Sequence, residues 1–348
     1  MVYYQYASFA NKQLRQLEGS EEYKRQKEWS TKVNAEISEL EGRITASRSS
    51  TEKDELRRRK DKSKKLLEAD EKHLKEHEAA VTSFLQQAIS MYAHYMEVSD
   101  NLDQEIAVRF CGLWFAHFGN EIAAESIRHA LPKISTHKLL FLSHQLTARL
   151  GSTIESEKLS QRFLKQIVEA MCLMHPHHSL FQVLSMRGMV PSAKDPPEER
   201  VANETSTRRE EAKRIIESLR VKVKSGAHQR PDRFIELMED SFAAYVEWAQ
   251  HPIKDLNCKS KVWYSIPKNI ALYRWTWDGN RAKKPQPLGI PVATTDIPIE
   301  TDGQYRDIPT IHWYERRFTV AGGVHIPKIN VCVDSLGRQH KQLVSSHF

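Results

Sequence analysis

The sequence predicts a mainly α-helical protein in which a helical solenoid with a long charged hairpin precedes a short β segment. Three observations lead to this prediction. Most of the 13 glycines and 14 prolines lie beyond residue 185, so the first half has few residues that break helices. Apolar residues in that half recur at helical spacing. After residue 310 the pattern changes to short runs of β-branched and aromatic residues, which favour strands.

The first predicted feature is an antiparallel helical hairpin over residues 21–97. From Trp29 the apolar residues advance by steps of four or three, which places them on one side of a helix. A polar break follows at 49–51, and Thr51 with Asp54 fits the capping box of a second helix. Charged residues dominate both segments, so we expect the tip of the hairpin to be solvated.

Shorter and more apolar helices are expected up to residue 250, and their succession resembles a helical solenoid. Gly119 and Gly151 each follow a predicted helix, at the position where glycine is preferred. Ser135 or Thr136 is the expected N-cap of the helix that ends before Gly151. Further helices are expected at 155–174, 177–186, 207–224 and 231–249, with a proline-rich loop at 188–206.

The pattern changes at residue 251. Residues 251–309 are rich in proline and tryptophan, which predicts an irregular linker packed by its aromatic side chains. Strands are expected within 310–320, 329–333 and 340–344. Because two or three strands alone are marginally stable, we expect the sheet to be incomplete within residues 310–348 and to need a partner.

Composition excludes several classes of protein. We expect no membrane segment and no secretory signal, because no apolar run of sufficient length occurs. The four cysteines, Cys111, Cys172, Cys258 and Cys332, lie far apart, which argues against a disulfide scaffold. The formal net charge of +7 suits nucleic acid only if it gathers on one face.

Two local patterns invite a functional interpretation. Arg57-Arg58-Arg59-Lys60 is the strongest candidate for nucleic-acid contact, but consecutive residues point all round a helix and acidic residues are interleaved, so a solvated surface is favoured over a phosphate contact. Cys172 with the histidines of 175–178 suggests a metal. Pro176 among them favours a helix junction, and we expect neither a metal site nor catalytic residues in this chain.

The segment FTVAGGVHIPKINVCVDSLGRQHKQLV, residues 318–344, closely resembles the start of the catalytic domain in ATM-type kinases, which are phosphatidylinositol 3-kinase-related protein kinases. YASFANKQ (6–13), LSHQLTARLG (142–151) and MHPHHSLF (174–181) resemble the FAT region of the same family, a helical solenoid that clamps the kinase domain. The resemblance runs in order along almost the whole chain. It implies a FAT-type helical region at 1–250, the linker at 251–309 and the first strands of a kinase N-lobe at 310–348.

The resemblance also implies where a nucleotide lies. Ala321 and Pro327, with Gly322 and Gly323 between them, would border the adenine side of the ATP cleft. The turn Asp334-Ser335-Leu336-Gly337 would cover the phosphates.

The family places its ATP-binding lysine after a Leu-Val pair, whereas Leu343-Val344 is followed here by Ser345. The catalytic loop and the magnesium-binding aspartate would lie beyond residue 348. We therefore expect a catalytically incomplete fragment that needs no cofactor of its own, from a parent kinase that uses ATP and magnesium.

Two functions are open at this stage. In the first, the chain is a scaffold fragment of an ATM-like serine/threonine kinase of DNA-damage and telomere signalling. The family then implies nuclear localisation, a homodimeric parent, the rest of the kinase domain as a partner and a DNA-end-sensing complex as another. In the alternative, the chain is an independent helical adaptor whose charged hairpin binds proteins or nucleic acid.

Overall fold

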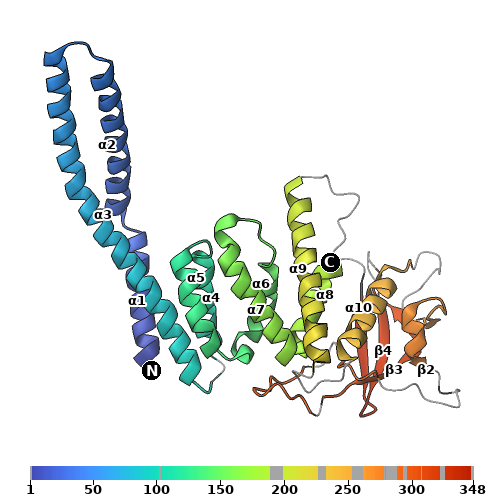
Figure 1. Cartoon of the computed structure of the whole chain (residues 1–348). Helices are drawn as coiled ribbons and strands as arrows, with labels where there is room; N and C mark the ends of the chain where they lie inside the picture. The colour runs from blue at the N-terminus through green and yellow to red at the C-terminus, as the bar shows by residue number, and fades with distance from the viewer. Residues whose placement is uncertain are drawn as a thin grey trace. The chain divides into compact units, whose positions relative to one another are not determined.

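A computed structural model describes residues 2–101, 103–188, 199–225, 233–252, 262–277, 279, 288–292, 296–306, 308–321 and 326–345, with only the backbone considered at 199–205. The chain divides into two compact units, residues 1–135 and 136–348. The predicted mainly α class is confirmed, since helices account for most of the described residues and the strands come last (Figure 1).

The first unit is entirely helical in its described part. It contains α1 (Val2–Glu18), α2 (Glu21–Ala46), α3 (Ser50–Val98), α4 (Gln104–Ala116), α5 (Glu121–Ala130) and the 3₁₀ helix η1 (Leu131–Lys133). Figure 1 shows α2 and the first half of α3 side by side as an extended hairpin, as the sequence predicts. Val33 and Leu40 of α2 and Leu56 and Leu67 of α3 are buried along it, whereas Trp29 is exposed.

The cap between the two hairpin helices differs from the expected one. Ser49, not Thr51, is the N-cap of α3, and its hydroxyl accepts a hydrogen bond from the Glu52 backbone N–H at 3.5 Å. Thr51 lies inside the first turn. Serine in extended conformation two residues earlier satisfies the same unpaired backbone donors, so the helix begins earlier.

The second unit continues with helices that pack in sequence order. They are η2 (Thr136–Leu142), α6 (Ser143–Ala148), η3 (Glu155–Glu157), α7 (Lys158–Met174), α8 (Pro176–Gly188), α9 (Glu199–Lys224) and α10 (Phe234–Gln250). Residues 136–142 are therefore 3₁₀ and only the six residues of α6 are α-helical, where one longer helix is expected from the sequence.

The expected loop at 188–206 is also shorter than predicted, because α9 begins at Glu199. Residues 189–198 lie outside the described part of the chain.

Buried ion pairs join the last helices. The Glu239 carboxylate of α10 is 7% exposed and accepts from Arg187 of α8 and, at 2.5 Å, from Arg220 of α9. Lys222 of α9 donates to Glu169 of α7 at 2.8 Å. Because a buried carboxylate must be compensated, Glu239 fixes the spacing of three helices.

The strands form one sheet that covers α10. The strands are β1 (Tyr264–Ser265), β2 (Thr276–Trp277), β3 (Ile311–Val320), β4 (Lys328–Asp334) and β5 (Gln339–Val344), and the 3₁₀ helix η5 (Ala271–Trp275) precedes β2. The order is β1-β3-β4-β5, antiparallel throughout, and β2 pairs with β3 in parallel. The linker, expected to be irregular, thus supplies β1 and β2.

The histidine segment at the α7–α8 junction is packed by the linker. Pro176 begins α8 and His175 is fully buried. Its Nδ1 lies 2.7 Å from the Tyr305 hydroxyl and its Nε2 lies 3.1 Å from the Thr136 hydroxyl. His177 and His178 also lie against the Tyr305 ring. Within the described ranges no three potential metal ligands come together, and Cys172 is a buried free thiol.

In the part of the chain that the structure describes, none of the helices combines the length and the apolar character needed to cross a membrane.

The Tyr305 hydroxyl should matter for stability. We expect Tyr305→Phe to lower the free energy of unfolding by about 1 to 3 kcal/mol, because it removes a buried hydrogen bond of His175 while keeping the ring. Tyr264→Phe, at a less buried tyrosine of the same unit, is the control and should change it less. Urea denaturation measures both, and equal effects would contradict the buried role.

Candidate functional site

Ala321 and Pro327 come together where β3 passes into β4. The Ala321 backbone N–H donates to the Pro327 carbonyl at 2.9 Å, just beyond the last register pair, Val320 with Lys328. Ile326 has a positive φ of 38°. The predicted adenine-side residues therefore form one end of the β3–β4 hairpin. Gly322 and Gly323 lie outside the described residues.

The predicted phosphate-covering turn lies at the other end of β4. Asp334 pairs with Ile311 in the register, and Gly337 has a φ of 81°, the left-handed conformation that suits glycine in a turn. Lys328 and Asp334 are the two ends of β4, so about 20 Å of strand separates the two predicted groups. The structure does not bring them together.

The turn uses its own backbone donors. Ser335 N–H donates to the Thr310 carbonyl at 2.8 Å, and Gly337 N–H donates to the Asp334 carbonyl at 2.9 Å. The N–H groups of Leu336 and Arg338 both donate to Asp334 Oδ1 at 2.9 Å. Phosphate-binding turns present unused N–H groups to the ligand. That this turn contacts a nucleotide stays a prediction.

The Asp334 carboxylate organises this turn. It is fully buried, and its Oδ2 accepts from Arg338 Nε and His340 Nε2, both at 2.8 Å. Burial by itself would raise the pKa of the Asp334 carboxyl, but the hydrogen bonds from His340, Arg338 and Leu336 outweigh it and hold that pKa well below its usual range.

A lysine that sequence reasoning missed lies at the adenine-side end of β4. Lys328 is 2% exposed, and its ammonium donates to the carbonyls of Trp248, of Ala249 at 3.0 Å and of His251 at 2.8 Å. Its Nζ also lies 4.7 Å from the centre of the Trp248 ring. These carbonyls belong to the end of α10, the last helix before the sheet.

One face of α10 reaches three strands. The Tyr245 hydroxyl lies 2.5 Å from the Tyr314 hydroxyl of β3 and donates to Gln342 of β5 at 2.6 Å. Trp248 Nε1 donates to Asn330 of β4 at 3.1 Å. Burial raises the pKa of the Tyr245 phenol well above its usual value, so the phenol acts here as a neutral donor. Residues three apart on a helix share a face, which explains the contact.

A signal for this face is present in the sequence. Alternate residues of β4 point to the same side of the sheet, and Lys328, Asn330, Cys332 and Asp334 are all buried there. A polar set at period two normally indicates a solvent-facing side. Here α10 covers Lys328 and Asn330, and the following turn covers Asp334.

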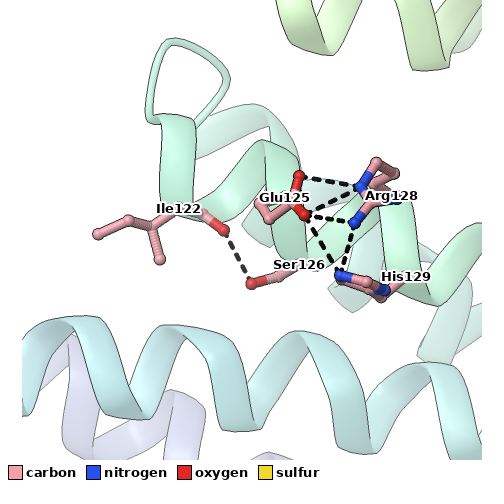
Figure 2. Close-up of polar contacts among 5 residues, drawn as sticks. All are labelled: Ile122, Glu125, Ser126, Arg128 and His129. Carbon is pink, nitrogen blue, oxygen red and sulfur yellow. Dashed lines mark hydrogen bonds and ion pairs between the residues drawn. The ribbon is translucent and has the colours of Figure 1, made fainter.

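Two exposed clusters of charge need no ligand to explain them. On α5, Arg128 binds Glu125 one turn earlier, with Nη2 to Oε1 at 2.5 Å, and His129 lies 3.2 Å from the same carboxylate (Figure 2). The Arg128 guanidinium holds the pKa of Glu125 below its usual value. Such pairs at three and four residues support a helix locally.

The second cluster is the basic run of the hairpin. Arg59 of α3 pairs with Glu36 of α2 at 2.8 Å, Lys60 pairs with Glu41 at 3.4 Å, and Arg57 pairs with Asp54 at 3.5 Å. Most of these side chains are well exposed. The positive charges are therefore partly neutralised by their own hairpin.

The fold is similar to that of solved kinase structures. The structure described as the FAT and kinase domain of CtTel1 gives a TM-score of 0.75 and 21% identity over 98% of this chain and 21% of that chain. The open conformation of CtTel1 gives a TM-score of 0.77 and 22% identity over 99% of this chain and 12% of that one.

The sequence comparisons show which kinases this chain is similar to. The serine/threonine-protein kinase TEL1 of Cryptococcus neoformans is 28% identical over 347 residues, which are 98% of this chain and 10% of the relative. Neurospora crassa tel1 is 27% identical over 99% of the chain and 11% of the relative, and the serine-protein kinase ATM of Sus scrofa is 26% identical over 80% and 9%. No family model matches the sequence. The chain is a homologue of the Tel1 and ATM kinases, which confirms the predicted resemblance, and it spans about a tenth of the length of these relatives.

Removing the Asp334 carboxylate should destabilise the hairpin. We expect Asp334→Ala to lower the free energy of unfolding by about 3 kcal/mol, because it leaves the turn donors without their acceptor. Asp240→Ala, which removes an exposed carboxylate of α10, is the control and should change it by less than about 1 kcal/mol.

The effect of Asp334→Ala on the free energy of unfolding should depend on pH. Because the folded-state pKa of Asp334 is lowered, its contribution is complete above the unfolded-state pKa of about 3.9 and is lost as the pH falls below that value. The difference between wild type and Asp334→Ala should therefore shrink in acid. A constant difference from pH 7 to pH 3 would contradict this assignment.

The basic run should bind DNA only weakly. We expect duplex binding that is independent of sequence and lost at moderate salt, because few phosphates can be neutralised at once. Replacing Arg57, Arg58, Arg59 and Lys60 by Gln should leave the helical circular dichroism unchanged, and replacing Lys72 and Lys75 serves as the control. Fluorescence anisotropy across a salt series measures the binding. Sub-micromolar affinity at physiological salt, abolished only by the four substitutions, would support the adaptor alternative.

Proposed function

We propose that this chain is the helical scaffold and the first N-lobe strands of an ATM-like serine/threonine protein kinase that acts in DNA-damage and telomere signalling in the nucleus. The observation that carries the proposal is the junction of α10 with the sheet, where Tyr245, Trp248 and Lys328 join the last helix to three strands. The homology to Tel1 and ATM along 98% and 80% of the chain supports it.

In this function the chain positions a cleft and does not carry out the chemistry. The parent kinase would transfer the terminal phosphate of ATP, with magnesium, to a protein hydroxyl. Ala321 and Pro327, whose backbones are hydrogen-bonded at the end of the β3–β4 hairpin, would border the adenine. Ser345 stands at the position where the family resemblance places a lysine. These 348 residues by themselves should therefore transfer no phosphate.

Partners follow from the same proposal. The rest of the kinase domain would extend the sheet and complete the cleft. Solved structures similar to this chain include the complete CtTel1 dimer with C2 symmetry and a butterfly-shaped symmetric Tel1 kinase dimer. A homodimeric parent is accordingly part of the proposal, as is a DNA-end-sensing complex that recruits it.

Two measurements test the proposal. The isolated chain should show weak or undetectable ATP affinity by calorimetry, with or without magnesium, and no transfer from radiolabelled ATP above a heat-treated control. A chimaera in which residues 1–344 replace the matching segment of a full-length Tel1 kinase, so that the family's lysine follows Val344, should transfer phosphate to serine or threonine in a protein substrate. Tight magnesium-dependent binding by the isolated chain, or an inactive chimaera, would contradict the proposal.

A further inference from the structure

Lys328 closes the end of α10 from outside the helix. The last carbonyls of an α-helix have no partners within it, and buried ones need donors from elsewhere. An ammonium group has three N–H donors. Lys328 directs them at three carbonyls, those of Trp248, Ala249 and His251, although it lies 77 to 80 residues later in the chain. The Trp248 carbonyl also accepts from the His251 backbone N–H at 3.3 Å, so the lysine adds a second donor there.

The surroundings of this ammonium contain no compensating acid. From α10, the Trp248 ring lies against it, with the His251 ring stacked on that tryptophan at 5.9 Å. From the sheet, Asn330 and Phe318 contact the same tryptophan. Among the described residues no carboxylate pairs with Lys328. The charge is held by carbonyl dipoles and the negative end of the helix dipole, and burial lowers the pKa of Lys328 to about 8.

The position of Lys328 ties this cap to the nucleotide side of the hairpin. It directly follows Pro327 and pairs in the register with Val320, which directly precedes Ala321. The backbone link from Ala321 to Pro327 then closes the same end. Anything that moves the end of α10 relative to β4 therefore moves the two residues predicted to border adenine.

We propose that Lys328 is a positioning residue for ATP. By capping α10 it fixes the Ala321–Pro327 end of the hairpin against the helical region, and so sets the affinity of the kinase for the nucleotide. The inference rests on the proposed kinase function. It assigns no chemistry to the lysine, which lies on the buried face and touches the helix.

The test uses a full-length Tel1 kinase in which residues 1–344 of this chain replace the matching segment, so that the family's lysine follows Val344. This chimaera without further substitution is the wild type of the comparison. Lys328→Met keeps the aliphatic length but removes all three donors, and we expect it to raise the KM for ATP about tenfold with a smaller change in kcat, a typical size for coupling between two sites. Lys341→Met, at an exposed lysine of β5, is the matched control and should leave both constants unchanged.

Hydrogen exchange supplies a readout that a purely structural role would not change. Coupling is reciprocal, so ATP should slow amide exchange at residues 248–251 in the wild type and not in Lys328→Met. Should the methionine variant fail to fold, the pH profile decides. The wild-type KM for ATP should rise as the pH passes about 8, and Lys328→Arg, which stays charged throughout, should flatten that rise.

The outcomes separate the two proposals. Two results would overturn the positioning role and leave the kinase function standing. The first is an active wild type together with a folded Lys328→Met whose KM for ATP and ATP-dependent protection are unchanged. The second is identical pH profiles for wild type and Lys328→Arg. An inactive wild type would overturn both. A raised KM together with loss of ATP-dependent protection is the result that we expect.

Discussion

The packing of α10 against the sheet in the second unit depends on the hydrogen bonds from the Lys328 ammonium to the carbonyls at the end of α10. Lys328 donates there to the carbonyls of Ala249 and His251, and it places a charged residue on the covered face of the sheet. Once this contact is made, Trp248 reaches Asn330 and Tyr245 reaches both β3 and β5 from the same helix face. Helix and sheet are thereby held in one register, because each polar group of the interface depends on the next.

The helices were largely predictable from the sequence because their causes are local. Apolar spacing and few helix-breaking residues indicated the hairpin and α7 to α10, although the N-cap of α3 is Ser49 where Thr51 was expected. The other errors occur where distant parts of the chain decide. Residues 136–142 are 3₁₀, with His137 and Leu139 buried, and β1 and β2 exist only because β3 offers them an edge. Neither effect has a signature within a short window of sequence.

The candidate site was predictable only in part, for the same reason. The pairing of Ala321 with Pro327 follows from a strand reversal, which a sequence pattern indicates. The buried polar face of β4 does not, because Lys328 and Asp334 at alternate positions resemble a solvent-facing side. The partner that buries Lys328 is a helix about 80 residues earlier, and no spacing rule connects the two.

The two ends of β4 are stabilised in different ways, and this difference bears on function. Asp334 finds all its donors within six residues, so its turn keeps its shape whatever the helical region does. Lys328 finds its acceptors only in α10, so the opposite end of the same strand follows the helix. A strand fixed locally at one end and through a distant helix at the other transmits movement to one end alone. That end carries Ala321 and Pro327, which are the residues predicted to border adenine. A scaffold that regulates nucleotide binding would act at this end.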